Sequence, residues 1–182
     1  MKKVYIVLSK SDTIPSRVIS NITKAEYSHV SISLDSKFKH MYSFGRKYKY
    51  AMLPGGFIHE SLYKGVMGAS ITMKCAVYEL EVSNASYRRL KWLLNYMNEN
   101  KGLYKYNAFG LLPTMFGREF ERENCFFCSQ FVYYALITSG AIEEIKHHSL
   151  IRPMDLSELP MSKEIFKGNI DQLRSFSMDF QV

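Results

Sequence analysis

The sequence predicts a single α+β domain, in which an antiparallel sheet packs against helices. Segments of alternating apolar and polar residues, typical of half-buried strands, are interspersed with segments whose apolar residues recur at helical spacing. Tyr and Phe are plentiful, at 13 and 12 residues, and aromatic residues are enriched in strands. The chain of 182 residues is 47% hydrophobic, which suffices for one buried core, so we expect residues 1–182 to form one domain.

The first quarter of the chain is expected to form strands around one helix. The apolar run at 3–9 predicts a buried strand, and residues 14–22, with Pro15 near the start, predict a helix. Residues 27–35 alternate cleanly and predict a strand with one apolar face. Residues 38–45 are expected to pair with that strand in a hairpin.

The rest of the chain contains the two clearest helices. Proline and paired glycines favour a loop over 53–62, whereas residues 71–82 alternate as a strand does. The remaining expectations are a capped amphipathic helix over 83–102, a short helix or packed loop over 104–117, a helix from 128 to about 140, a loop over 147–160 and a last edge strand over 163–171.

The formal charge of +7 is spread along the chain, and no run of five or six basic residues occurs. This pattern favours a plain basic surface, so we expect no nucleic-acid partner. The apolar run near the N-terminus is too short for a secretion signal, and no apolar stretch approaches the ~20 residues of a membrane span. We therefore expect a cytoplasmic protein without a transmembrane segment, whose three cysteines are reduced.

The sequence "ENCFFCSQFVYYALITSG", residues 123–140, contains two of the cysteines. Cys128 aligns with Val132, Ala135 and Ser139 along one side of the predicted helix, which places Cys128 in the first turn on the inward face. The helix dipole and the free N–H groups of that turn favour a thiolate over a thiol. The same N–H groups can bind an oxyanion, so Cys128 is a candidate nucleophile.

A thiolate nucleophile needs a base, and His29 is the best candidate among the five histidines. It begins the strand "YSHVSISLD", on the face opposite Val30 and Ile32, among small polar residues. An ordinary half-exposed strand histidine is the alternative interpretation. His40 and His59 lie near charges and loops, and the pair at 147–148 follows a helix C-terminus, where cationic side chains are favoured.

Zinc binding is the main chemical alternative, with Cys125 and Cys128 forming one knuckle and Cys75 and a histidine completing the site. The sequence has no second Cys-x-x-Cys and no His-x-x-x-His, so we expect no metal. A redox pair also begins a helix with Cys-x-x-Cys, but there the first cysteine attacks and the motif follows the first strands of a short βαβ unit.

The motif "FCSQFVYYAL" resembles the nucleophile motif of the NlpC-type papain-like cysteine hydrolases. The histidine strand "YSHVSISLD" precedes the cysteine helix, an order that resembles the circularly permuted branch, which includes YiiX-like proteins and lecithin retinol acyltransferase-like enzymes. The segments "HMYSFGRK", "GGFIHESL", "KYNAFGLL" and "LIRPMDL" are similar to further segments of a bacterial YiiX-like group. The resemblance covers most of the chain and implies a permuted papain-like fold.

The resemblance also implies site residues. Cys128 matches the nucleophile and His29 the base, whereas Cys125 matches no catalytic position. The family's third polar residue lies on the strand after the histidine strand, where Ser43 is the first choice and His40 the second. Tyr106 matches a tyrosine that lines the site upstream of the cysteine.

The expected function is therefore that of a cysteine hydrolase or acyltransferase, acting on a peptide, amide or lipid-like substrate without a cofactor. Cys128 would attack a carbonyl, and His29 would protonate the leaving group. A serine orients an imidazole less strongly than a carboxylate does, and this favours, as the alternative, a non-catalytic binding module that keeps the papain-like fold.

Overall fold

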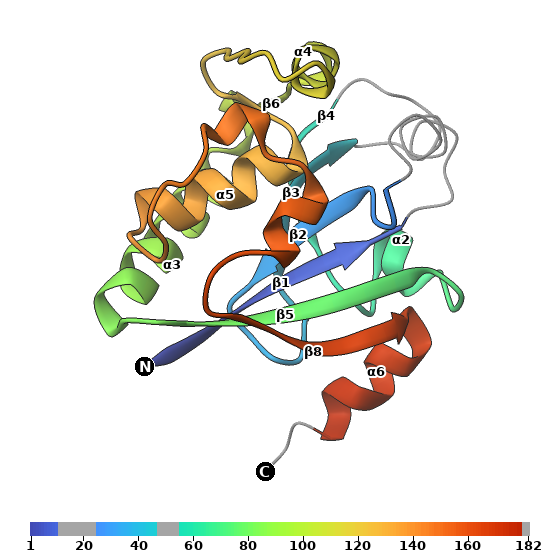
Figure 1. The fold of residues 1–182 in the computed structure, drawn as a ribbon. Helices are drawn as coiled ribbons and strands as arrows, with labels where there is room; N and C mark the ends of the chain where they lie inside the picture. The colour runs from blue at the N-terminus through green and yellow to red at the C-terminus, as the bar shows by residue number, and fades with distance from the viewer. Residues whose placement is uncertain (11–24, 47–54, 180–182) are drawn as a thin grey trace.

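One eight-stranded sheet forms the centre of the molecule in the computed structural model, which describes residues 1–10, 25–46 and 55–179 (Figure 1). Its strands are β1 (Lys2–Ser9), β2 (His29–Ser33), β3 (Met41–Arg46), β4 (Gly55–Glu60), β5 (Lys74–Val82), β6 (Lys105–Tyr106), β7 (Cys125–Phe126) and β8 (Ser162–Asn169). Their order is β7-β6-β4-β3-β2-β1-β5-β8, and neighbours pair antiparallel except for β6 and β7, which are parallel.

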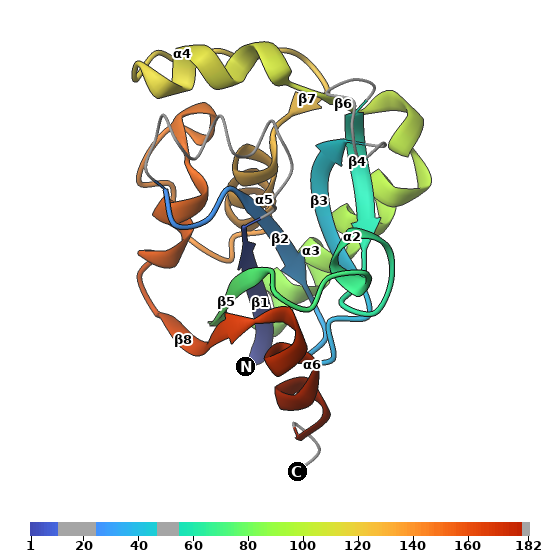
Figure 2. The ribbon, with the colours of Figure 1, turned by 90° about the vertical axis from the view of Figure 1, so that its right-hand side faces the viewer.

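Helices cover both faces of this sheet, and the predicted α+β class is confirmed (Figures 1 and 2). One face carries α3 and α5, and the other carries α2 and α6. The helices are α2 (Gly65–Gly68), α3 (Asn84–Glu99), α4 (Leu111–Met115), α5 (Cys128–Thr138) and α6 (Ile170–Asp179), with 3-10 turns at Lys101–Leu103, Ala108–Gly110, His148–Leu150 and Pro153–Ser157. None of the helices in the described ranges is long and apolar enough to cross a membrane.

Two apolar cores lie on the two faces of the sheet. The core under α3 and α5 takes Val30 and Ile32 from β2, and Phe131 from α5. The core under α6 takes Val7 from β1 and Cys75 from β5. Strands β1 and β5 contribute to both cores, because Val4 of β1 and Leu80 of β5 belong to the core under α3 and α5.

Local sequence signals located most of these elements correctly. The helix predicted over 83–102 is α3, where the Ser83 hydroxyl accepts the N–H of Ser86 at 3.0 Å as an N-cap. The predicted last strand is β8, at the edge of the sheet. The helix predicted over 14–22 lies outside the described residues.

The expected loop over 53–62 is wrong for residues 55–60, because they form strand β4 between β3 and β6. Its paired glycines permit close approach of neighbouring strands rather than a turn. A Cβ atom on Gly55 would lie 2.8 Å from the carbonyl oxygen of Gly45, and one on Gly56 would collide with the carbonyl oxygen of Tyr104. Strand β4 ends at Glu60, and this brings the Glu60 side chain to His29 of β2.

Candidate active site

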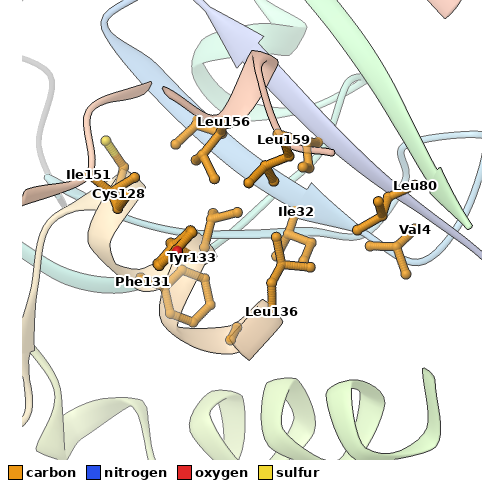
Figure 3. Packing of buried hydrophobic residues seen from close by; sticks show 14 of the residues in the cluster. Val4, Ile32, Leu80, Cys128, Phe131, Tyr133, Leu136, Ile151, Leu156 and Leu159 are labelled. Atoms are coloured by element: carbon orange, nitrogen blue, oxygen red, sulfur yellow. The ribbon is translucent and has the colours of Figure 1, made fainter. Parts of the chain in front are cut away.

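Cys128 is the first residue of α5, which agrees with its predicted position in the first turn of this helix. Phe127 precedes it in an extended conformation, and the carbonyl of Phe127 accepts the N–H of Phe131 at 3.0 Å. Cys128 is only 6% exposed and belongs to the core under α3 and α5, at the edge of the group of residues drawn in Figure 3. The N–H groups of this first turn have no partner within the helix and can bind a negative charge.

The start of α5 is anchored by buried polar side chains. The Ser129 hydroxyl donates to the carbonyl of Ile151 at 2.6 Å, and the Gln130 side-chain oxygen accepts the N–H of Phe127 at 3.4 Å. The helix packs against β2 and β3 of the sheet. These contacts set the position of the thiol relative to the sheet.

His29 begins β2 and is bound by the carboxylate of Glu60, from the end of β4. The Nε2 atom of His29 lies 3.2 Å from Oε1 and 3.0 Å from Oε2 of Glu60. The hydroxyl of Ser31, two residues along β2, donates to the same Oε2 atom. Both side chains are largely buried, at 19% and 18% exposed, so water screens this pair less than it screens a surface ion pair.

The charges of this pair stabilise each other. Burial alone lowers the pKa of His29, but the negative charge of Glu60 and hydrogen bonding outweigh burial and hold that pKa well above 6.5. Burial alone raises the pKa of Glu60, but the His29 imidazolium and the hydrogen bonds from His29 and Ser31 hold it below 4.5. The two groups therefore form an imidazolium–carboxylate pair at neutral pH.

Cys128 also acts on the His29 ring. The Cys128 side chain, first through hydrogen bonding and then through charge, is among the causes that raise the pKa of His29. His29 is thus the group on which both the Glu60 carboxylate and the Cys128 sulfur converge, although the three residues come from β2, β4 and α5. A nucleophile, a base and a group that orients the base are the components of a catalytic triad.

The structure places both residues predicted as the third group elsewhere. The hydroxyl of Ser43 is fully buried and donates to the carbonyl of Val30 at 2.6 Å. His40 is exposed, and its Nδ1 lies 3.0 Å from Nε2 of His59. The position at His29 Nε2 is taken by Glu60, which the sequence analysis missed because it was assigned to a loop.

Tyr106 lies on the short strand β6, opposite Phe126 of β7. Phe126 is two residues before Cys128, so the strand pairing brings Tyr106 to the segment that leads into the nucleophile helix. Its part in binding an oxyanion stays a prediction.

The three cysteines occupy different environments. Cys75 packs into the core under α6, on the face of the sheet opposite Cys128, and burial raises the pKa of its thiol to about 12. Cys125 is on β7, at the other end of the sheet from Cys75. Among residues 1–10, 25–46 and 55–179, no cysteine belongs to a group of three convergent metal-ligating side chains, so the geometry gives the zinc alternative no support.

The His29–Glu60 pair should make stability depend on pH. Because the pKa of His29 is raised, the contribution of His29 to the free energy of unfolding is fully present below pH 6.5. This contribution is lost as the pH rises through the raised pKa. Because the pKa of Glu60 is lowered, its contribution is fully present above pH 4.5 and is lost as the pH falls through the lowered value. The pair therefore stabilises the fold most between pH 4.5 and 6.5.

The measurement is urea denaturation of the wild type and of Glu60→Gln across this range. We expect the difference in unfolding free energy to be largest near about pH 5.5 and to shrink on both sides of the window. A difference that does not change with pH would contradict the ion pair.

Comparison of the chain with protein-family models, with curated proteins and with solved structures finds no match.

Proposed function

We propose that this protein is a cysteine hydrolase or acyltransferase of the permuted papain-like type, with Cys128 as nucleophile, His29 as base and Glu60 as the residue that orients the base. The observation that carries the proposal is the environment of the His29 imidazole. Its Nε2 atom is bound to Glu60, and the Cys128 side chain helps to raise its pKa. Glu60 supports catalysis over a non-catalytic binding module, since the argument for that module rested on a weak third group.

The proposed reaction begins with attack by the Cys128 sulfur on the carbonyl carbon of an amide or ester. Because Glu60 occupies Nε2 of His29, Nδ1 is the nitrogen that holds the proton taken from the Cys128 thiol, so the attacking species is a thiolate beside the imidazolium. The carbonyl oxygen becomes negative and is stabilised by N–H groups of the first turn of α5, with Tyr106 as a further donor. His29 then protonates the leaving amine or alcohol, which departs and leaves a thioester on Cys128.

The second half of the reaction releases the acyl group. His29 accepts a proton from water, and the resulting hydroxide attacks the thioester carbon, which frees a carboxylic acid and restores the thiolate. An alcohol or amine in place of water would make the same site an acyltransferase. The class of substrate we propose is a peptide, another amide or a lipid-like ester.

Alkylation by iodoacetamide at neutral pH tests the nucleophile directly. We expect Cys128 to react faster than Cys75 or Cys125, as followed by mass spectrometry of each peptide, because only a thiolate reacts rapidly. The buried Cys75 thiol, with its pKa of about 12, is the internal slow reference. The variant His29→Ala should slow alkylation of Cys128 at least about tenfold.

His40→Ala is the matched control, because His40 contacts His59 rather than Glu60. This variant should leave the rate at Cys128 unchanged. Equal and slow alkylation of all three cysteines, or the same rate in wild type and His29→Ala, would refute the proposed mechanism.

A further inference from the structure

A second group of reactive side chains lies beside α5 and takes no part in the proposed reaction. Glu121 comes from the segment between α4 and β7, and His147 and His148 come from the segment after α5. Each offers one ligand atom, and the three atoms lie within 4.8 Å of one another. Within the described ranges, this is the one group of three metal-ligating side chains that converges in this way.

The spacing of these atoms fits a small metal ion. The Nε2 atom of His147 is 3.5 Å from Oε1 of Glu121, and Nε2 of His148 contacts the same oxygen. Bonds of ~2.0–2.2 Å at tetrahedral angles place neighbouring ligand atoms ~3.3–3.5 Å apart. The Glu121 side chain is 53% exposed, so a small movement of it would increase the distance between its Oε1 atom and Nε2 of His148 to that spacing.

Both imidazoles are held by side chains behind them, as metal-binding histidines generally are. The Nδ1 atom of His147 lies 2.8 Å from the hydroxyl of Ser149, and Nδ1 of His148 lies 3.3 Å from the amide nitrogen of Gln130. Ser149 and Gln130 are buried. The Ser149 hydroxyl can accept Nδ1–H of His147, which leaves Nε2 of His147 free to bind a metal.

The electrostatics of the group also suit a cation. The Glu121 carboxylate places a negative charge within ion-pair distance of both imidazoles. Two imidazole nitrogens and one carboxylate oxygen prefer zinc and its neighbours in the first transition series over magnesium or calcium.

We propose that Glu121, His147 and His148 bind a divalent transition-metal ion such as Zn²⁺, with water completing the coordination. The ion would join the segment before β7 to the segment after α5. Because Gln130 is the third residue of α5 and contacts His148, the bound ion would also be linked to the turn that begins with Cys128. The site is independent of the proposed hydrolysis.

Calorimetric titration of the full chain with ZnCl₂ tests the site. We expect one zinc ion per chain, and at least about tenfold weaker binding in Glu121→Gln and in His147→Ala. Saturating zinc should raise the melting temperature of the wild type by about 5 °C or more, and that of Glu121→Gln by much less. Glu121 is half exposed, so Glu121→Gln is expected to fold even where a histidine variant does not.

The control is His59→Ala, which removes the other contacting histidine pair and should leave zinc affinity unchanged. Binding of Co²⁺ distinguishes this site from the cysteines, because nitrogen and oxygen ligands give visible bands without a thiolate charge-transfer band. Absence of saturable zinc binding, or binding that persists in both Glu121→Gln and His147→Ala, would overturn the proposal. Loss of binding in Cys128→Ser would overturn it too.

Discussion

Replacing Cys128 with serine is expected to reduce hydrolysis of an activated ester, such as a 4-nitrophenyl ester, by at least about 10⁴-fold. The proposed thiolate forms at the start of α5 beside the His29 imidazolium, whereas a serine hydroxyl in the same place keeps its proton. The measurement is kcat/KM for release of nitrophenol, together with mass spectrometry of the acyl group on the peptide that contains residue 128.

Cys125→Ser is the matched control, since Cys125 lies three residues away on β7 and is equally buried. Its kcat/KM should stay within about threefold of the wild-type value. Equal ester hydrolysis by the wild type and Cys128→Ser would contradict the assignment of the nucleophile, and an acyl group found on Cys125 would reverse the roles of the two cysteines.

Replacing Glu60 with glutamine is expected to have the second largest effect, a loss of about 10²- to 10³-fold in kcat/KM. The neutral amide removes the negative charge that supports the His29 imidazolium, and it no longer holds Nε2–H with two oxygens. The profile of kcat/KM against pH should change as well, because the pKa of His29 falls when its carboxylate partner is removed. The measurement is that profile in both proteins.

Ser43→Ala distinguishes this assignment from the one that the sequence favoured. The Ser43 hydroxyl is bound to the Val30 carbonyl, so its loss should lower the free energy of unfolding by about 1 kcal/mol and leave kcat/KM within about threefold. If Ser43→Ala lost activity while Glu60→Gln kept it, the serine would be the orienting residue and the observed hydrogen bonds would not describe the working enzyme.

The two residues that begin the proposed reaction were identifiable from local patterns. The helical spacing of apolar residues after Phe127 placed Cys128 in the first turn, and α5 does begin at Cys128. The alternation around His29 placed it on a strand with Val30 on the opposite face, and β2 does begin at His29. Patterns of this kind are readable because a helix and a strand each repeat over a few residues.

Glu60 was not identifiable in the same way. Paired glycines such as Gly55 and Gly56 are typical of a turn. In the structure, their lack of side chains instead allows the backbones of Gly45 and Tyr104 to lie close to β4. Phe57 and Ile58 are both apolar and are followed by two polar residues, so the sequence of this strand lacks the alternation that marks a half-buried strand.

The α+β class, the helix that begins with a cysteine and the strand that begins with a histidine are predictable from local sequence patterns. The carboxylate that completes the group is visible only in the folded chain, because His29 and Glu60 are 31 residues apart and meet through the pairing of β2, β3 and β4. Strand order and register depend on pairing between distant segments, which a periodic pattern within one segment does not encode. The same reason explains why Glu121 and the two adjacent histidines, separated in sequence by the whole of α5, became a single group only in the folded chain.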